Sequence, residues 1–558
     1  MTVPNPSTAE AMVMVDELVR NGVKRAVIAP GSRSAALALA LAGHPGIELA
    51  TEIDERSAGF LALGSGLAGD MAAVVTTSGT AAANLLPAIV EADAAGVPLL
   101  ALTADRPPEL RQAGANQVID QIKLYGERVR FFAEVGPAED LPTSNGYWRS
   151  VVCQGVAAAR GMGRRPGPVH LNLGFREPTV PVADDGRSSA GPFESGVDGR
   201  PGGLPWSEVA PVPMPRVTVA ERWQAARGLV LAGDCRAEGG AVAAAMAAAL
   251  GWPLIAEPHS GARGQGAIST AHYLLGHDVF AESHRPEVII QLGRVGLSRR
   301  VATLANSDIP RLVFDPWAWS DPSRSAVAVH SALPEIPTPR PSGRWLEGWA
   351  EAEAVARAAL DAALDALGEP SEPRTARDVA RIAGEHPLVV SSSMPVRDLD
   401  LVMEAGGPEI LANRGASGID GFVSTALGVS WGRGGPVLAL AGDLSMLHDQ
   451  AGLLVEPRPP VVFVVNNNDG GGLFHFLPQS ALPGFEQLFA TPHHRRFGKV
   501  AELHGLAFGR IESAEDLIPM VESALAEGTG WLVEVPGDRI RNVEVHEQIE
   551  KAVTAALS

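Results

Sequence analysis

The chain contains 558 residues, which predicts about three or four domains at the usual size of roughly 150 residues per domain. Hydrophobic residues make up 46% of the sequence and charged residues 20%, the composition of a folded globular protein and not of a disordered one. The formal net charge is −19, from 45 Lys and Arg against 64 Asp and Glu. This charge argues against a nucleic-acid partner or an anionic membrane surface, so any anionic small ligand must meet local cations.

The cysteines and apolar stretches exclude further classes. Cys153 and Cys235 are the two cysteines, and neither has a nearby Cys or His at metal-ligand spacing. The uncharged stretches 71–90 and 239–256 are interrupted by polar residues, Gly or Pro, so they predict no membrane insertion. The N-terminus lacks a basic region followed by an apolar run. We therefore expect a cytoplasmic protein.

The N-terminal part of the chain alternates between helix and strand patterns. Ser7 and Glu10 match a capping box, which predicts a helix that begins at Ser7 and ends at Gly22. The strands predicted after it are 26–29, 47–53, 72–76 and 98–103, and the helices are 55–68 and 80–94. Strands that alternate with helices indicate a parallel, doubly wound sheet covered on both faces.

Two segments with linker composition divide the rest of the sequence. One is the Gly, Pro and Ser-rich stretch 185–216, and the other is the Pro-rich stretch 333–343. Apolar strand patterns follow each of them, at 228–233, 253–256, 287–293 and 311–315, and then at 388–392, 436–443, 460–468 and 531–538. We therefore predict an α/β protein of three doubly wound parallel-sheet domains in series, with limits at 1–184, 205–335 and 345–558.

Two strand ends in the third domain carry oxygen ligands. Asp443 follows one apolar strand and Asn468 follows the next, 25 residues later, which leaves room for one helix between two adjacent parallel strands. A carboxylate, an amide oxygen and the carbonyl of Gly470 are hard ligands that suit Mg²⁺, and the glycines that follow allow close approach to a diphosphate. Either half alone could equally be a simple turn or loop, but both together favour a metal site.

Other patterns are weaker. The sequence GSGLAG at 64–69 fits a dinucleotide-binding motif, but it ends a predicted helix and precedes a strand, so helix packing and a helix end are the better interpretation. His493, His494, Arg495 and Arg496 form a polar run that could suggest a metal or phosphate site. A solvated loop is the simpler reading of that run.

The metal motif belongs to a wider resemblance. GDLS at 442–445 with NNNDG at 466–470 resembles the diphosphate and magnesium motif of thiamine-diphosphate enzymes, which contain three α/β domains in series. The segments that sharpen the match are PGSRS (30–34), EIDERSAGF (52–60), TTSGTAAANLLPA (76–88), TADRPPEL (103–110), GANQ (114–117) and NRGASGIDG (413–421). This set resembles the 2-succinyl-5-enolpyruvyl-6-hydroxy-3-cyclohexene-1-carboxylate synthases of menaquinone biosynthesis, and it spans nearly the whole chain.

The resemblance implies how the cofactor is held. Glu55 would hydrogen-bond the pyrimidine ring of thiamine diphosphate and favour its imino tautomer. Ile419 would lie under the thiazolium, and Leu473 and Phe474 would form apolar walls, although each of the three could instead be an ordinary core residue. The metal, Mg²⁺ with Mn²⁺ as a substitute, would be bound by Asp443, Asn468 and Gly470. The other implied cofactor-binding residues are Thr80, Gly415, Ser417, Gly442, Leu444, Ser445 and Gly471.

The resemblance also implies the substrates, 2-oxoglutarate and isochorismate, both dianions that guanidinium groups bind well. Ser393, Arg397 and Arg414 would hold the part derived from 2-oxoglutarate. The residues that would face isochorismate are Ser32, Arg33, Arg106, Asn116 and Gln117, with Arg33 and Gln117 as catalytic candidates beside Glu55. Arg299 and Arg300 are both candidates for a further substrate contact. A homo-oligomer is implied, because in this family each active site lies between subunits.

Two other functions remain open at this point. A different thiamine-diphosphate 2-oxoacid decarboxylase or carboligase would need fewer carboxylate-binding arginines than the chain has at its strand ends. A catalytically silent binding protein would be expected to lack Glu55 or the pair Asp443 and Asn468, and all three are present. Retained cofactor binding without turnover of any 2-oxoacid would nevertheless favour this second alternative.

Overall fold

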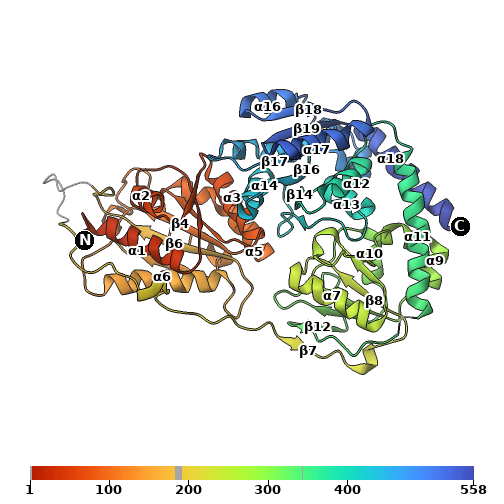
Figure 1. The fold of residues 1–558 in the computed structure, drawn as a ribbon, viewed down its shortest axis with the longest axis horizontal. Coiled ribbons are helices and arrows are strands. Elements are labelled where there is room, and N and C mark those ends of the chain that lie inside the picture. The colour runs from red at the N-terminus through yellow and green to blue at the C-terminus, as the bar shows by residue number, and fades with distance from the viewer. Residues whose placement is uncertain (1–2, 182–190, 342) are drawn as a thin grey trace. The chain divides into compact units, whose positions relative to one another are not determined.

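The computed structural model describes residues 3–181, 191–341 and 343–558 (Figure 1). The predicted domain limit at 184 and the start of the predicted linker, 185–190, lie outside these ranges. The chain forms two compact units, one made of Met1–Val212, Asn413–Gly435 and Leu447–Pro460, and the other of Pro213–Ala412, Pro436–Met446 and Val461–Ser558. Together they contain three parallel sheets of five or six strands, so the predicted fold class is confirmed. None of the described helices has the length and apolar character needed to cross a membrane.

The first unit contains a six-stranded parallel sheet in the order β2-β1-β3-β4-β6-β5. Its strands are β1 (Arg25–Ile28), β2 (Glu48–Thr51), β3 (Ala72–Thr76), β4 (Leu99–Asp105), β5 (Phe132–Val135) and β6 (Pro168–Gly174). Its helices are α1 (Pro6–Arg20), α2 (Ala35–Gly43), α3 (Glu55–Leu67), α4 (Thr80–Asn84), α5 (Leu86–Ala95), α6 (Ser144–Ala159) and α14 (Phe422–Arg433). Helices α1 and α6 pack against each other (Figure 1) and contribute to one apolar core with the strands.

Two helix boundaries differ from the prediction. The capping box at Ser7 is wrong, because α1 begins at Pro6 and is capped by Asn5, whose side-chain oxygen accepts from the backbone N–H of Thr8 at 2.8 Å. Proline lacks the N–H that a first helical turn leaves unpaired, so it fixes the start one residue earlier. The helix expected at 80–94 is two helices, α4 and α5, with a break at Leu85 before a proline.

Helix α3 packs closely against α14. A Cβ at Gly64 would lie 2.2 Å from the carbonyl oxygen of Thr425, and a Cβ at Gly428 would lie 2.1 Å from that of Leu61. The two glycines therefore allow the helix backbones to meet. Because α3 ends at Leu67 and β3 begins at Ala72, the interpretation of 64–69 as helix packing and a helix end is confirmed.

The second unit contains the other two large sheets. The middle sheet has the order β12-β11-β10-β8-β9, and a two-stranded sheet joins β7 (Arg216–Val217) to β13 (Leu333–Pro334). The middle strands are β8 (Gly228–Ala232), β9 (Leu254–Ala256), β10 (Val288–Leu292), β11 (Arg311–Phe314) and β12 (Ala328–His330). The helices beside them are α7 (Arg236–Leu250), α8 (Ala271–Leu274), α9 (Asp278–Ser283) and α10 (Arg299–Ala305).

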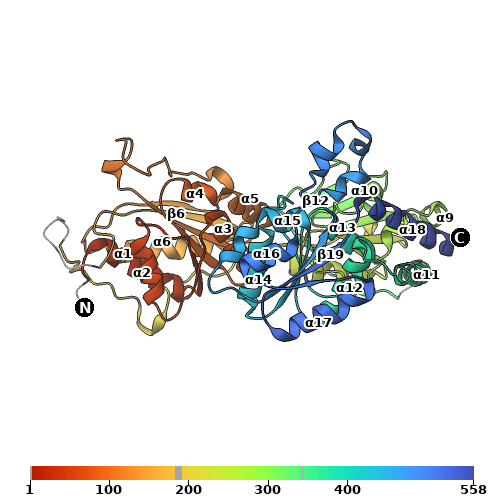
Figure 2. The same ribbon diagram turned by 90° about the horizontal axis from the view of Figure 1, so that it is seen from above.

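The C-terminal sheet has six parallel strands in the order β15-β14-β16-β17-β19-β18. They are β14 (Leu388–Val390), β15 (Ile410–Leu411), β16 (Val437–Gly442), β17 (Val461–Asn467), β18 (Ala507–Arg510) and β19 (Trp531–Pro536). The helices of this region are α11 (Arg344–Asp365), α12 (Glu372–Ala383), α13 (Met394–Val402), α15 (Asp443–His448), α16 (Phe497–His504), α17 (Leu517–Glu527) and α18 (Arg539–Leu557). Helix α12 packs beside α17, and α11 beside α18 (Figure 2).

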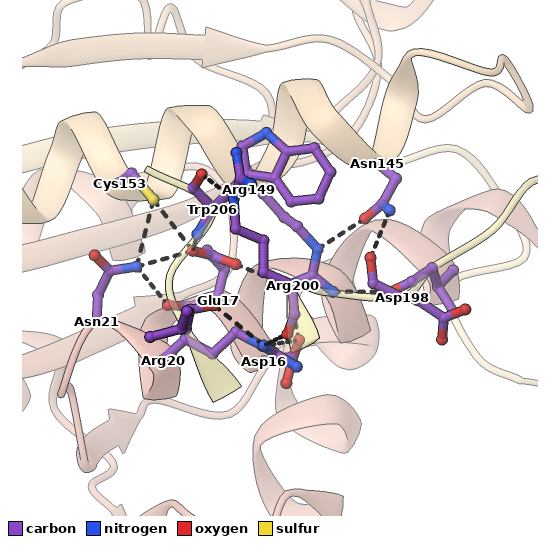
Figure 3. Close-up of polar contacts among 12 residues, drawn as sticks. Asp16, Glu17, Arg20, Asn21, Asn145, Arg149, Cys153, Asp198, Arg200 and Trp206 are labelled. Atoms are coloured by element: carbon purple, nitrogen blue, oxygen red, sulfur yellow. Dashed lines mark hydrogen bonds and ion pairs between the residues drawn. The ribbon is translucent and has the colours of Figure 1, made fainter. Parts of the chain in front are cut away.

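A buried ion-pair network connects α1 and α6 to the segment 197–206, which follows the N-terminal sheet in sequence (Figure 3). The guanidinium of Arg149 contacts carboxylate oxygens of Asp16 and Glu17, each at 2.7 Å, and donates to the carbonyl oxygen of Val197 at 2.7 Å. The side chains of Arg149 and Glu17 are only 1% and 0% exposed. The second carboxylate oxygen of Glu17 accepts from the backbone N–H of Trp206 at 2.6 Å, so one buried pair joins three parts of the unit.

Replacing Arg149 with Met should destabilise the first unit strongly. The substitution leaves the buried Glu17 carboxylate without its cation, which costs about 3–5 kcal/mol in the free energy of unfolding. Urea denaturation followed by tryptophan fluorescence measures the change. The matched control is Arg128→Met, because the Arg128 side chain is 60% exposed in its ion pair with Asp93; that loss should be below about 1 kcal/mol. Equal effects of the two substitutions would contradict the assignment.

Candidate active site

In the first unit, the neighbouring strands β1, β3 and β4 end at one edge of the sheet, and the loops after β1 and β4 carry the predicted isochorismate-binding residues. Ser32 and Arg33 follow β1, Ser78 follows β3 and Arg106 follows β4. Ligands bind at this edge of parallel sheets. Ser32 is exposed, whereas Arg33 is 9% exposed, donates to the carbonyl oxygen of Phe175 at 3.0 Å and pairs with Glu177 at 3.0 Å.

Ser78 connects Arg106 to the loop that carries Asn116 and Gln117. Its hydroxyl accepts from Arg106 and donates to the carbonyl oxygen of Gln117 at 2.9 Å, and its own carbonyl oxygen accepts from Nε2 of Gln117 at 3.0 Å. Gln117 has a φ of 58° and is exposed, as is Asn116. Burial, and then the charge of Arg33, lowers the pKa of Arg106. The structure therefore brings Arg33, Arg106 and Gln117 together at one edge.

Glu55 is the first residue of α3, directly after the loop that follows β2. Its Oε2 accepts from the side-chain amide of Asn84 at 3.1 Å, and the cap of the helix is Asp54. Thr80, at the start of α4, is exposed. Close by in sequence, Glu52 is only 1% exposed, and burial raises its pKa to about 7. Sequence reasoning missed Glu52, because its burial depends on the surrounding fold.

The segment with Arg414, Gly415, Ser417 and Ile419 belongs to the first unit. The Glu91 carboxylate accepts from the backbone N–H groups of Gly415, at 2.7 Å, and Ala416, at 2.6 Å. A Cβ at Gly415 would lie 2.5 Å from the backbone nitrogen of Ala95, so only glycine fits against α5. Ser417 has a φ of 62°, and Arg414 and Ile419 are half-buried. Glu91 lies more than 300 residues away in sequence, so no local motif could identify it.

In the second unit, β16 and β17 are adjacent parallel strands, as predicted, and place Asp443 and the 468–472 loop at one edge. Asp443 is 2% exposed; one of its oxygens, Oδ2, accepts from the N–H of Gly470 at 2.9 Å and lies 3.2 Å from Nε2 of His493. Gly470 has a φ of 138°, and a Cβ there would lie 2.1 Å from the carbonyl oxygen of Ala490. The backbone at this position therefore requires glycine.

Asn468 points one end of its side-chain amide at a buried acid. Its Nδ2 donates to Oε1 of Glu372 at 2.7 Å, while its Oδ1 is buried and has no hydrogen-bond partner in the structure. Burial raises the pKa of Glu372 to about 8, the nearby Asp398 carboxylate adds to this effect, and the hydrogen bond from Asn468 opposes it. Asp398 in turn lies 2.8 Å from Nε2 of His546.

These residues fit the Mg²⁺ that the resemblance implies. An unpaired, buried amide oxygen is costly unless a ligand meets it, and Asn468 Oδ1 has the chemistry of a hard-metal ligand. The described residues include no group of three His, Cys, Asp or Glu side chains that could hold a metal ion. A metal here would therefore depend on the Asp443 carboxylate, on amide and carbonyl oxygens, and on oxygens of a diphosphate and water.

The remaining predicted cofactor-binding residues of this unit adjoin the same loops. Gly442 ends β16 and Leu444 and Ser445 lie in α15, whereas Gly471 lies in the 468–472 loop and Leu473 and Phe474 follow that loop. The backbone N–H of Gly471 donates to the carbonyl oxygen of Ala490 at 2.7 Å. Leu473 and Phe474 are half-buried. Ser445 is buried and Leu444 half-buried.

The interpretation of 493–496 as a solvated loop is wrong for its first residue. The His493 side chain is 10% exposed and contacts Asp443, and the backbone N–H groups of His493 and His494 donate to Oδ1 of Asp469, at 3.1 and 2.6 Å. His494, Arg495 and Arg496 are exposed, as expected of a loop. Sequence reasoning missed the role of His493, because its partner Asp443 lies 50 residues away.

Ser393 and Arg397 lie after β14, the strand next to β16. Ser393 has a φ of 77° and directly precedes α13, and its carbonyl oxygen accepts from Nη1 of Arg397 at 2.6 Å. Burial lowers the pKa of Arg397. Beyond β10 in the middle sheet, Arg300 is tied to the carbonyl oxygen of His272, at 3.1 Å, and to Glu550, whereas Arg299 is exposed.

Comparison with known proteins matches these regions to three family descriptions. The thiamine pyrophosphate enzyme N-terminal TPP-binding domain matches residues 9–124, the middle domain of thiamine pyrophosphate enzymes matches 204–311, and the C-terminal TPP-binding domain matches 403–535. The first match includes Arg33, Glu55 and Arg106, and the third includes Asp443 and Asn468.

Whole-chain relatives are more specific. A 2-succinyl-5-enolpyruvyl-6-hydroxy-3-cyclohexene-1-carboxylate synthase of Thermobifida fusca is 46% identical over 99% of this chain and 100% of its own length. The proteins of the same name from Saccharopolyspora erythraea and Salinibacter ruber are 43% and 39% identical, over 99% of this chain and 100% and 98% of their own lengths. The chain therefore belongs to the 2-succinyl-5-enolpyruvyl-6-hydroxy-3-cyclohexene-1-carboxylate synthase family of thiamine-diphosphate enzymes.

Proposed function

We infer that the chain catalyses the thiamine-diphosphate-dependent decarboxylation of 2-oxoglutarate and the 1,4-addition of the remaining four-carbon unit to isochorismate. The product is 2-succinyl-5-enolpyruvyl-6-hydroxy-3-cyclohexene-1-carboxylate, an intermediate of menaquinone biosynthesis. The observation that carries this conclusion is the similarity to synthases of that name, which reaches 46% identity over 99% of the chain. The arginines at two sheet edges support it, because both substrates are dianions.

We propose that the cofactor is held with Mg²⁺, for which Mn²⁺ can substitute. Asp443, Asn468 and Gly470 would bind the metal, and Glu55 would accept a hydrogen bond from, or share a proton with, the pyrimidine ring of the cofactor. Thiamine diphosphate, when bound, supplies a nucleophilic carbon and an electron sink for the loss of carbon dioxide. The other proposed cofactor contacts are Thr80, Gly415, Ser417, Ile419, Gly442, Leu444, Ser445, Gly471, Leu473 and Phe474.

The proposed substrate contacts fall into two groups. Ser393, Arg397 and Arg414 would hold the 2-oxoglutarate-derived part. Ser32, Arg33, Arg106, Asn116 and Gln117 would bind isochorismate, and Gln117 would contact or protonate the ring as the new bond forms. Of the two arginines on α10, Arg299 is the better candidate for a substrate contact, because Arg300 already holds His272 and Glu550.

We further propose a cytoplasmic homo-oligomer whose active sites lie between subunits. The proposed domains are a pyrimidine-binding domain at 1–184, a central domain at 205–335 and a diphosphate- and metal-binding domain at 345–558. Both cysteines are unbridged, in keeping with a reducing compartment.

The test is a product assay with both substrates. The purified chain, supplied with thiamine diphosphate and Mg²⁺, is incubated with 2-oxoglutarate and isochorismate, and the products are identified by mass spectrometry. We expect loss of carbon dioxide and a new adduct that requires both substrates, and no adduct after treatment with a metal chelator. If 2-oxoglutarate disappears no faster with isochorismate present and no adduct forms, the proposed function is wrong. Turnover of pyruvate instead would favour another thiamine-diphosphate enzyme, and no turnover at all a silent binding protein.

A further inference from the structure

The orientation of the Asn468 amide depends on one buried neighbour. Its Nδ2 donates to Oε1 of Glu372 at 2.7 Å, and no other hydrogen bond of this side chain is recorded among the described residues. An amide that rotates by 180° exchanges a donor for an acceptor at almost no steric cost. Without a partner that fixes its orientation, Asn468 could therefore present N–H groups, which cannot bind a metal, where an oxygen is needed.

Glu372 is chemically suited to fix that orientation. A carboxylate oxygen can only accept, so the Asn468 amide nitrogen is the end that pairs with it, as the 2.7 Å contact between Nδ2 and Oε1 shows. The amide oxygen then faces away from Glu372, and this is the oxygen that is buried without a partner. Both side chains are buried, at 5% and 9% exposure, so water offers little alternative.

Glu372 itself is held firmly. It is the first residue of α12, after Ser371 and before Pro373, and α12 packs against α13, α17 and β16. Helix packing thus fixes the Glu372 backbone relative to the strand whose end carries Asp443. The sequence gives no hint of this arrangement, because Glu372 and Asn468 are 96 residues apart.

We propose that Glu372 is a positioning residue for the metal site, which orients the Asn468 carboxamide so that its oxygen faces the divalent cation. This proposal rests on the proposed function, in which Asp443, Asn468 and Gly470 bind Mg²⁺. Partners behind a metal ligand typically change metal affinity by about 10- to 100-fold when they are lost. Glu372 acts through Asn468 and is not itself assigned a contact with metal or substrate.

The test uses substitutions that exchange the hydrogen-bond donor, Asn468, and the acceptor, Glu372. In Glu372→Gln, the new amide offers a donor as well as an acceptor, so it no longer selects one orientation of Asn468, and metal affinity should fall. In Asn468→Asp, a carboxylate faces the Glu372 carboxyl group, so affinity should also fall. In the double variant, the glutamine amide can donate to one aspartate oxygen while the other faces the metal, whichever way the side chain rotates. Affinity should therefore recover, which loss of folding stability alone would not produce.

We would measure the binding of Mn²⁺ to the full chain at saturating thiamine diphosphate. Electron paramagnetic resonance reports the concentration of free Mn²⁺, and Mg²⁺ is added as a competitor for the same site. We expect the dissociation constant to rise about 10- to 100-fold in Glu372→Gln and to return most of the way to the parent value in the double variant. The matched control is Glu385→Gln, which removes the same charge at an exposed position near the end of α12. It should leave binding unchanged.

The outcomes distinguish failure of the proposed metal site from failure of the positioning role of Glu372. If the parent chain binds no Mn²⁺, the proposed metal site fails. If the parent binds but Glu372→Gln binds equally well, or the double variant is no tighter than the weaker single variant, only the positioning role is overturned. Should Glu372→Gln be insoluble, Asn468→Asp is compared directly with the double variant. Tighter binding by the double variant supports the role, and equal binding overturns it.

Discussion

Replacing Glu55 with Gln is expected to lower kcat by about 10²- to 10⁴-fold at saturating substrates, the range that a lost proton-transfer group typically costs. The proposed role of Glu55 is to hydrogen-bond a ring nitrogen of the cofactor and stabilise its imino tautomer. A carboxylate can do this because it accepts strongly and can share the proton. A glutamine amide has nearly the same shape as the carboxylate but is a far weaker base. The cofactor should therefore still bind, while its activation for catalysis fails.

The local structure makes Glu55→Gln an informative substitution. Glu55 lies at the start of α3, and its Oε2 accepts from the side chain of Asn84 at 3.1 Å, a contact that a glutamine oxygen can keep. The helix cap belongs to Asp54, so α3 should remain intact. Steady-state kinetics with both substrates measures kcat, and a fluorescence titration measures cofactor affinity. Glu127→Gln, at an exposed position of the same unit, is the control.

A Glu55→Gln variant within about threefold of the parent kcat would remove Glu55 from the proton-transfer role, because that loss is far below the range such groups contribute. A variant that lost cofactor binding together with activity would indicate a structural role instead. Glu52 would then be the next candidate, because it is buried three residues before the first residue of α3 and burial raises its pKa to about 7.

The fold was predictable wherever a strand is a continuous apolar run. Strands β3, β8, β16 and β17 are buried over all or nearly all of their length, and the sequence marks each of them within one or two residues. A parallel strand covered on both faces needs such a run, so composition alone identifies it. The short, half-exposed strands β5 and β18 have no such pattern and were not predicted.

Strand β6 shows a different limit. All seven of its residues are buried, but His170 and Asn172 interrupt the apolar pattern. Nε2 of His170 and Oδ1 of Asn172 both contact the hydroxyl of Thr103 on β4, at 2.7 and 2.8 Å, so a neighbouring strand pairs one polar atom of each. Burial lowers the pKa of His170 to about 3, so this side chain is neutral. Pairing of this kind depends on tertiary structure, and local sequence therefore suggested no strand.

The candidate site divides in the same way. Arg33, Arg106, Arg397 and Asp443 lie in the segments that directly follow strands, a position that the order of apolar runs predicts. The residues that hold the site loops, namely Glu91, Glu372 and His493, come from helices or loops distant in sequence. Their hydrogen bonds join segments at least 50 residues apart, so no spacing rule could find them.

The second large effect is expected for Arg397→Ala, which should lower kcat/KM for 2-oxoglutarate by about 10²- to 10³-fold, or about 3–4 kcal/mol. Nη1 of Arg397 already donates to the carbonyl oxygen of Ser393 at 2.6 Å, so one end of the guanidinium is fixed. Arg397 is half-buried, so its cation is partly shielded from water, and this burial lowers its pKa. A substrate carboxylate would replace lost water contacts, and alanine provides no cation for it.

Which substrate's kinetic constants change is a sharper test of the proposed role of Arg397 than the size of the loss in kcat/KM. Arg397→Ala should leave the KM for isochorismate nearly unchanged, whereas Arg106→Ala, at the other predicted substrate group, should raise that KM and spare 2-oxoglutarate. Arg397→Lys keeps the charge but loses the fork geometry, so it should recover only part of the activity. Steady-state kinetics with each substrate varied in turn separates these effects. Equal losses toward both substrates in Arg397→Ala would show that the arginine supports the fold of the loop and does not bind the 2-oxoacid.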